Sequence, residues 1–205
     1  MAPPASDTPP CAICSKPAPL KCSRCKSIHY CDFECQKKDF KLHKIICKVY
    51  SEFDMNARPS PNHHLAFVFP EATQTSGPEN AQNAKVEPKL VWIASEKING
   101  CYYPDDKQLN AALRNGQYIF KQLIRFPDDK RNPTQEGRFM NLWCDDFFLI
   151  QPMPENPIIQ KLIPGSKLRG PFLFQTGTGV FHSPTGYRDM GVHDMKAIHE
   201  FLLKK

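Results

Sequence analysis

The stretch that decides the fold is residues 11–47, CAICSKPAPLKCSRCKSIHYCDFECQKKDFKLHKIIC. It contains a pattern of seven cysteines and one histidine, spaced as C-x2-C-x7-C-x2-C-x5-C-x3-C-x7-H-x3-C. The pattern residues are Cys11, Cys14, Cys22, Cys25, Cys31, Cys35, His43 and Cys47. Eight such ligands fill two tetrahedral zinc sites with none left over. The sequence therefore predicts two Zn²⁺ ions bound within the first 47 residues.

The spacing arranges these ligands as four pairs. Two residues between cysteines let a tight turn direct both sulfurs at one ion, as in the first two pairs. Members of the third and fourth pairs are four residues apart, so on a helix each pair shares one face. Sequential use would join the first pair with the second, whereas interleaved use would join the first with the third. Spacing alone leaves both arrangements open.

Two alternatives to this ligand set can be weighed. The cysteines would form disulfides only in an oxidising compartment. The N-terminal residues 1–7 have neither the basic nor the apolar region of a secretory signal, so we expect an intracellular protein, in the nucleus, the cytoplasm or both. His29 is a rival ligand in a RING-like register, but its use would leave His43 or Cys47 without a metal.

The run from Cys31 to Cys47 contains Gln36, Asp39 and Phe40 and follows two C-x2-C pairs and Tyr30. In this arrangement it resembles a MYND-type zinc finger. The resemblance covers residues 11–47 and implies interleaved pairs. One zinc would then take Cys11, Cys14, Cys31 and Cys35, and the other Cys22, Cys25, His43 and Cys47. The chain departs from the family in having Phe40 where a tryptophan is usual.

Zinc is expected to build this segment, because few large apolar residues lie between its ligands. Structural zinc contributes an apparent free energy of about 10–16 kcal/mol in finger peptides, so the metal-free segment should be unfolded. Four protein ligands at each ion would leave no position open for water or substrate. We therefore expect no catalysis at either metal.

The resemblance also implies a partner. MYND fingers bind proline-rich peptides of the type Pro-Pro-x-Leu-x-Pro, which are already extended and lose little entropy on binding. The family's contact residues fall at Ser23, Gln36 and Phe40 of this chain. Phe40 keeps an apolar surface but lacks an indole N–H donor. Packing inside the small core of the finger is the alternative role for Phe40. These features predict an adaptor or a transcriptional co-regulator.

Charge offers a second interpretation of the same segment. Residues 1–50 carry nine Lys or Arg and four Asp or Glu, but seven thiolates and two zinc ions would lower this formal +5 to about +2. Phosphate binding favours a denser basic surface. A nucleic-acid-binding regulator that uses the lysines of residues 37–48 is therefore the less favoured alternative, and a RING-like ubiquitin ligase is less favoured still.

The rest of the chain predicts a second domain. We expect a disordered Pro-rich tail at 1–10, the finger at 11–47, a linker at 48–61 and an α+β domain at 62–205. Loop insertions are expected at about 70–89 and 127–138. No run of 18 apolar residues is present, so we expect no membrane span.

Within 62–205, short apolar runs predict strands at 65–69, 90–93, 143–150 and 172–174. Residues 118–124 suit either a strand or a helix. The apolar stripe of residues 192–203 predicts an amphipathic C-terminal helix, with Gly191 or Asp189 at its start. Gly177-Thr178-Gly179 predicts a hairpin turn rather than a phosphate-binding loop.

Enzyme signatures are not evident in this domain. The Asn-His-x-Cys-x-Pro-Asn motif of SET methyltransferases is absent, as are G-x-G-x-x-G, G-x-S-x-G and P-loop patterns. No small-molecule substrate is therefore predicted. Residues 90–93, 169–171 and 187–190 resemble the C-terminal region of small fungal MYND proteins, for which no activity can be carried over.

Overall fold

The structure is a computed structural model that describes residues 8–72, 86–113, 119–124, 137–145, 153–180 and 183–204. The chain divides into two compact units. The first combines Met1–Phe53 with Gly191–Lys196, and the second combines Asp54–Met190 with Ala197–Lys205. Among the described residues, no helix has both the length and the apolar character needed to cross a membrane.

In its described residues, the first unit has little regular structure besides one long helix. Strand β1 (Leu20–Lys21) pairs antiparallel with β2 (His29–Tyr30), and helix α1 spans Phe33–Glu52. The Asp32 carboxylate caps α1 by accepting a hydrogen bond from the backbone N–H of Cys35 at 2.7 Å. The 3-10 helix η3 (Val192–Asp194) comes from the far end of the chain.

The predicted linker at 48–61 differs from what the structure shows. Its first residues continue α1 as far as Glu52, and the rest contains the 3-10 helix η1 (Met55–Ala57). Arg58 then donates a hydrogen bond to the carbonyl of His63, pairs with the Asp189 carboxylate and stacks 4.6 Å from the centre of the Trp92 ring. The end of the segment is therefore fixed within the second unit by polar and cation–π contacts.

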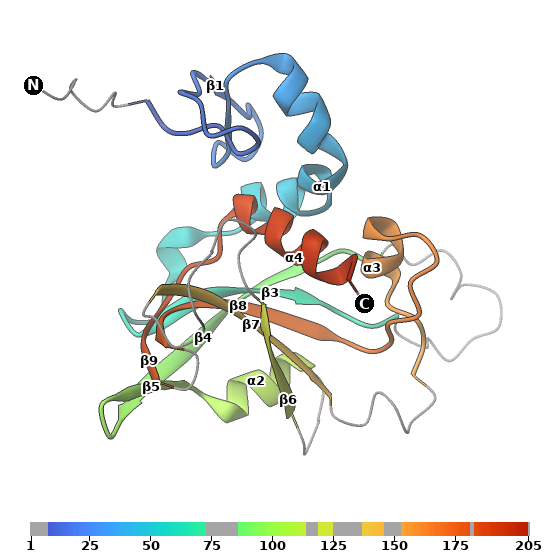
Figure 1. Cartoon of the computed structure of the whole chain (residues 1–205). Helices are drawn as coiled ribbons and strands as arrows, with labels where there is room; N and C mark the ends of the chain where they lie inside the picture. Colours follow the sequence, from blue (N-terminus) through green and yellow to red (C-terminus); the bar gives the residue numbers. More distant parts are fainter. Residues whose placement is uncertain are drawn as a thin grey trace, which may run out of the picture. The chain divides into compact units, whose positions relative to one another are not determined.

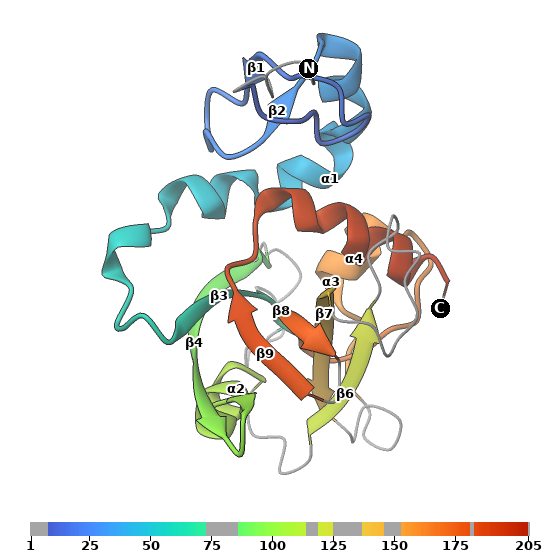
Figure 2. The same ribbon diagram turned by 60° about the vertical axis from the view of Figure 1, so that its left-hand side comes forward.

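The second unit is mostly β, where the sequence predicted an α+β domain. Its strands form one antiparallel sheet in the order β5-β4-β3-β8-β7-β6, with β9 also paired to β8. The sheet is strongly curved into a half-barrel (Figure 2). The strands are β3 (His63–Phe69), β4 (Lys89–Ile98), β5 (Cys101–Pro104), β6 (Ile119–Ile124), β7 (Gly137–Asp145), β8 (Phe172–Val180) and β9 (Ser183–Arg188). The sequence of residues 118–124 suited either a strand or a helix, and the structure has the strand β6 there.

Both faces of this sheet are covered. The last five residues of β3 are all buried, and since neighbouring side chains on a strand point to opposite faces, such a strand needs cover on each side. Helix α2 (Asp106–Leu113) lies on one face, and α3 (Pro157–Leu162) and α4 (Met195–Leu202) lie on the other (Figure 1). The predicted C-terminal helix is confirmed as the short helix α4. The residues expected to form its first turn form the 3-10 helix η3 instead.

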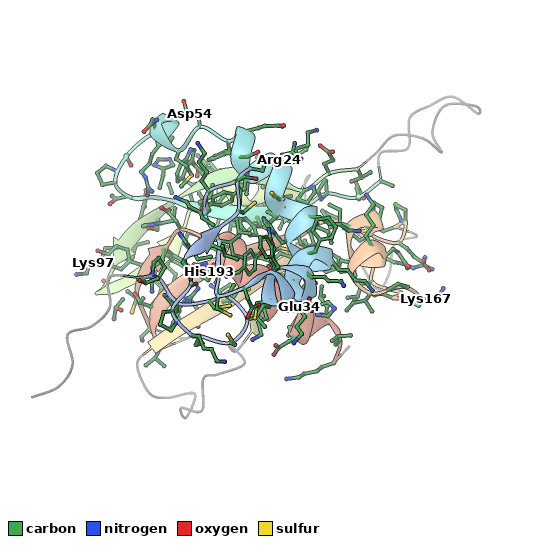
Figure 3. The ribbon with its side chains drawn as sticks, turned by 90° about the horizontal axis from the view of Figure 1, so that it is seen from above. Arg24, Glu34, Asp54, Lys97, Lys167 and His193 are labelled. Atoms are coloured by element: carbon green, nitrogen blue, oxygen red, sulfur yellow. The ribbon has the colours of Figure 1, made fainter. Side chains whose placement is uncertain are left out.

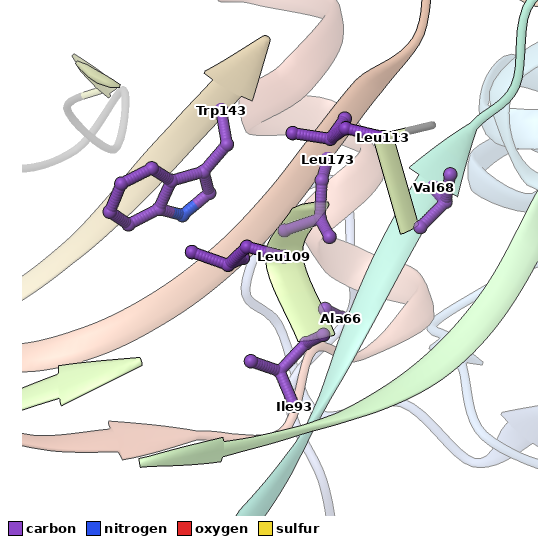
Figure 4. Close-up of a cluster of buried hydrophobic side chains, with 7 residues drawn as sticks. All are labelled: Ala66, Val68, Ile93, Leu109, Leu113, Trp143 and Leu173. Atoms are coloured by element: carbon purple, nitrogen blue, oxygen red, sulfur yellow. The ribbon is translucent and has the colours of Figure 1, made fainter. Parts of the chain in front are cut away.

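Each face has its own apolar cluster. On the α2 face, Leu109 and Leu113 of the helix meet side chains from four strands (Figure 4). The strand residues of this cluster are Ala66, Val68, Ile93, Trp143 and Leu173. On the opposite face, the rings of Phe69 and Phe174 are 5.0 Å apart. This second unit therefore has an ordinary hydrophobic core.

Helix α3 is attached to the sheet through one buried side chain. The Asn156 side-chain oxygen caps the helix by accepting from the N–H groups of Ile158 and Ile159. Its Nδ2 donates to the carbonyls of Phe69 and Gly170 at 3.1 and 2.8 Å.

The long charged side chains of this unit, such as Lys97 and Lys167, remain at the surface (Figure 3).

Several strand and loop boundaries in the structure differ from those that the sequence predicted. β7 begins at Gly137 instead of residue 143, and residues 146–150 lie outside the described part of the chain. Most of the predicted insertions also lie outside it, although Lys89 belongs to β4 and Gly137 to β7.

The predicted turn at residues 177–179 is wrong, because these residues belong to β8. At Gly177 a Cβ atom would lie 2.5 Å from Cζ of Phe139, so a larger residue would force the Phe139 ring to shift. Gly179 has a φ of +103° at the irregularity in the β8–β9 register, a conformation that favours glycine.

Candidate metal centres

The structure gathers the eight predicted ligands into two clusters. Within each cluster all four ligand atoms lie within 4.8 Å of one another. The all-cysteine cluster consists of Cys11, Cys14, Cys31 and Cys35, and the histidine-containing cluster consists of Cys22, Cys25, His43 and Cys47. The pairs are therefore interleaved. His29, the rival ligand, lies on β2 and belongs to neither cluster.

The distances within the clusters suit zinc. A tetrahedral ion with Zn–S bonds of about 2.3 Å separates two sulfurs by about 3.8 Å, and a sulfur from a nitrogen by slightly less. In the all-cysteine cluster, Cys31 Sγ lies 3.4 Å from Cys14 Sγ and 3.5 Å from Cys35 Sγ. In the histidine-containing cluster, Cys22 Sγ and Cys47 Sγ are 3.8 Å apart. A disulfide would need about 2.05 Å, so the donor sets fit metal and not sulfur–sulfur bonds.

Two equivalent turns present the C-x2-C pairs. In the first, the N–H of Ser15 donates to the carbonyl of Cys11 at 3.0 Å, and in the second that of Lys26 donates to Cys22, also at 3.0 Å. Ser15 and Lys26 have φ values of +60° and +52°. A left-handed residue directly after the second cysteine of each pair closes the turn and directs both sulfurs to one side.

Helix α1 presents the other ligands. Cys35 lies in its first turn, beside Cys31 just before the helix, while His43 and Cys47 are one turn apart farther along. Cys35, His43 and Cys47 are all buried. One helix therefore supplies ligands to both clusters and fixes the distance between them.

A hydrogen-bonded chain supports His43. Its Nε2 lies 3.3 Å from Cys25 Sγ within the cluster, while its Nδ1 lies 3.0 Å from the hydroxyl of Tyr30. The Tyr30 hydroxyl donates in turn to Oδ2 of the buried Asp39 at 2.6 Å. If Nε2 binds the metal, Nδ1 carries the hydrogen and donates a hydrogen bond to the Tyr30 hydroxyl oxygen. The chain from Asp39 through Tyr30 thus orients the imidazole.

Burial and a neighbouring charge set the protonation states of His43 and Tyr30. Burial lowers the pKa of His43, which favours the neutral imidazole that a metal ligand must be. Burial, followed by the adjacent Asp39 carboxylate, raises the pKa of Tyr30. Tyr30 therefore stays a hydroxyl and remains able to donate. The sequence pattern included Tyr30 and Asp39 but gave no signal for this role.

The three predicted peptide contacts all reach solvent to some extent. Ser23 lies in the second cysteine turn and is exposed, Gln36 is half-buried, and Phe40 is exposed. Gln36 and Phe40 are four residues apart on α1 and so share a face. The exposure of the Phe40 ring argues against the alternative that it packs inside the finger. Phe33, one of the few apolar residues of the segment, is exposed as well.

Comparison with known proteins agrees with this geometry. Residues 11–47 match the family model described as MYND finger. This stretch is therefore a MYND finger, with the two ligand groups, one of four cysteines and one of three cysteines and a histidine, that are typical of its two zinc ions. No solved structure is significantly similar to the chain.

Curated relatives match this chain over stretches of different length. The chain is similar to Ubiquitin carboxyl-terminal hydrolase 19 of Arabidopsis thaliana, with 48% identity over 50 residues, 24% of this chain and 7% of the relative. It is 39% identical over 131 residues to N-lysine methyltransferase SMYD2 of Gallus gallus, 62% of this chain and 28% of the relative. It is 49% identical over 37 residues to the Zinc finger MYND domain-containing protein 10 homolog of Drosophila melanogaster, 18% of this chain and 8% of the relative.

The chain thus spans less than a third of the length of each of these relatives. They come from a plant and from animals, and the likeness of the second half to small fungal proteins stays a prediction.

Proposed function

We propose that the finger is a zinc-dependent protein-interaction module that recognises proline-rich segments, in an adaptor or transcriptional co-regulator of the nucleus or cytoplasm. A MYND finger implies protein partners in general. The observation that carries the proposal is the accessible set Ser23, Gln36 and Phe40 on a scaffold whose two clusters each provide four ligands. The proposed role of the finger is therefore binding and not catalysis, because a four-ligand site leaves no position for substrate.

The preference for proline follows from what these side chains offer. An extended proline-rich peptide has carbonyl groups free along its backbone, which suit the hydroxyl and amide donors of Ser23 and Gln36. The Phe40 ring supplies an apolar surface for proline or leucine. Because the peptide is extended before it binds, little entropy is lost.

The test uses the full chain loaded with zinc and a labelled Pro-Pro-x-Leu-x-Pro peptide, measured by fluorescence anisotropy. Phe40→Ala and Gln36→Ala should each weaken binding about tenfold. Phe40→Trp should strengthen it, because the indole adds the N–H donor that this chain lacks.

Tyr103→Ala is the matched control, since Tyr103 is an exposed aromatic residue of the second unit. The proposal fails if no proline-rich peptide binds, or if Phe40→Ala binds as well as the wild type.

A further inference from the structure

Helix α1 exposes two large apolar side chains where a soluble helix would normally carry polar ones. Phe33 is 74% exposed and Phe40 is 58% exposed. They are seven residues apart, which is close to two helical turns, so both rings lie on one side of the helix about 10 Å apart along its axis. Single exposed apolar residues are common on protein surfaces, but two in register on one helix are typical of a docking stripe.

Lysines surround these two rings. Lys37, Lys41 and Lys44 lie on the same side of α1, and all three are exposed. The Nζ of Lys44 lies 5.9 Å from the centre of the Phe40 ring. We call Phe33, Lys37, Phe40, Lys41 and Lys44 the α1 stripe.

The positive charge of the α1 stripe is not neutralised within the part of the chain that the structure describes. None of the ion pairs found there involves a lysine of the stripe. Two acidic residues of α1 are used elsewhere: Asp39 is buried against Tyr30, and Glu52 pairs with Arg24 at 3.6 Å. Glu34, in the first turn, is the remaining acidic residue of this helix.

We propose that the α1 stripe binds an acidic protein segment, with apolar side chains that cover Phe33 and Phe40 and carboxylates that pair with the lysines around them. The two rings supply the area that is removed from water, and the lysines supply complementary charge and select against basic or neutral partners. The inference rests on the proposed role of the finger in protein binding, but not on its preference for proline. Phe33, Lys37 and Lys44 lie outside the residues assigned to proline-rich peptides.

Nucleic acid is the other class of partner that positive charge and aromatic rings attract. The lysines here are few, and with its metals bound the formal charge of residues 1–50 falls to about +2. Two phenylalanines also present more apolar area than contacts to phosphate would use. An acidic protein segment matches both components of the stripe, so it is favoured.

The experiment measures fluorescence anisotropy of labelled probes with the zinc-loaded full chain. The main probe is a peptide with two leucines seven residues apart and flanked by glutamates. Three others serve as comparisons: the same peptide with glutamine for glutamate, a Pro-Pro-x-Leu-x-Pro peptide and a single-stranded RNA. The acidic peptide should bind about tenfold more tightly than its glutamine version, and this difference should shrink as salt is added.

Two variants locate the site. Phe33→Ala and the double variant Lys37→Glu with Lys44→Glu should each weaken binding of the acidic peptide about tenfold or more. The control is Lys16→Glu with Lys21→Glu, which changes the net charge equally at exposed lysines of the finger that are not part of α1. It should retain most of the binding, and every variant should retain two zinc ions.

Each outcome has a defined meaning. Equal binding of the acidic and glutamine peptides, or equal losses in both lysine pairs, would overturn the proposal. RNA binding tighter than peptide binding, and lost in the same variants, would assign the stripe to nucleic acid instead. Phe33→Ala should leave binding of the proline-rich peptide unchanged, so the two proposals stand or fall separately.

Discussion

In the finger, most of the buried side chains are metal ligands, whereas in the second unit they are mainly phenylalanine, leucine, isoleucine and methionine side chains. Besides its ligands, the finger buries few apolar groups, chiefly Ala18, Ile28, Tyr30 and Ile46. The second unit packs an apolar cluster on each face of its sheet. The two units should therefore lose their structure for different reasons, the finger through loss of metal and the second unit through loss of packing.

The largest expected effect is that of removing zinc. A strong chelator should unfold the finger, because its apparent stabilisation by metal is about 10–16 kcal/mol and its apolar core is too small to replace that. The helical circular dichroism signal of α1 should fall, while the β signal of the second unit should remain. Elemental analysis before treatment should find two zinc ions per chain.

This comparison breaks if the treated protein keeps the helical signal of α1, since metal would then not be what holds the finger. It also breaks if the β signal disappears at the same chelator concentration. Adding zinc back to the treated sample serves as the control, and it should restore the helical signal.

The second largest expected effect comes from disturbing the apolar packing of the second unit while the metal sites are left intact. Phe174→Ala should destabilise the second unit by about 3–5 kcal/mol, because Phe174 is fully buried and packs against Phe69. Urea unfolding followed by tryptophan fluorescence measures this, since both Trp92 and Trp143 belong to that unit. Zinc content should stay at two ions per chain. A loss of zinc in this variant would show that the two units are not independently stabilised.

The same contrast explains what the sequence could predict. Ligand residues must be Cys or His at restricted spacings, so the pattern in residues 11–47 indicated its ligands directly. Spacing still left the pairing open, because either arrangement satisfies four ligands per ion. Resemblance to the MYND family supplied the interleaved pairing that the structure contains.

In the second unit the sequence located strands better than their ends. β3 and β8 were found because continuous apolar runs suit a strand covered on both faces. β7 was placed too late, since Arg138 and Asn141 interrupt its apolar pattern and its extent depends on pairing with β8, which is distant in sequence. Helix α2 was missed, because only Leu109 and Leu113 of its residues are buried.

The third prediction concerns the histidine-containing cluster. Tyr30→Phe removes the hydroxyl that links His43 to Asp39 and leaves the ring in place. Partners of a metal-binding histidine typically contribute about 10–100-fold in affinity, so we expect a loss of this size in zinc affinity at one cluster. Competition with a chromophoric chelator would resolve two classes of zinc, one weakened and one unchanged. The all-cysteine cluster is the internal control, and equal weakening of both sites would contradict an effect through His43.

The smallest expected effect tests whether buried polar groups help hold the second unit. Gln175 and Thr176 are neighbours on β8 and both are fully buried, but within the described residues only one of them is hydrogen-bonded through its side chain. The Thr176 hydroxyl donates to the carbonyl of Arg188 at 2.9 Å. Neither end of the Gln175 amide has a partner in the described part of the chain. The two positions therefore differ in what an apolar replacement removes.

Gln175→Leu should stabilise the second unit by about 1 kcal/mol, because it removes an amide that is buried without hydrogen bonds and fills its place with apolar atoms. Thr176→Val, the matched control, should destabilise by about 1 kcal/mol, because it keeps the shape but breaks a hydrogen bond. Urea midpoints at unchanged slope measure both. Changes of opposite sign in the free energy of unfolding would support the conclusion that apolar packing stabilises this unit. A destabilised Gln175→Leu would mean that the amide is bonded in solution, and that polar contacts contribute to this core as well.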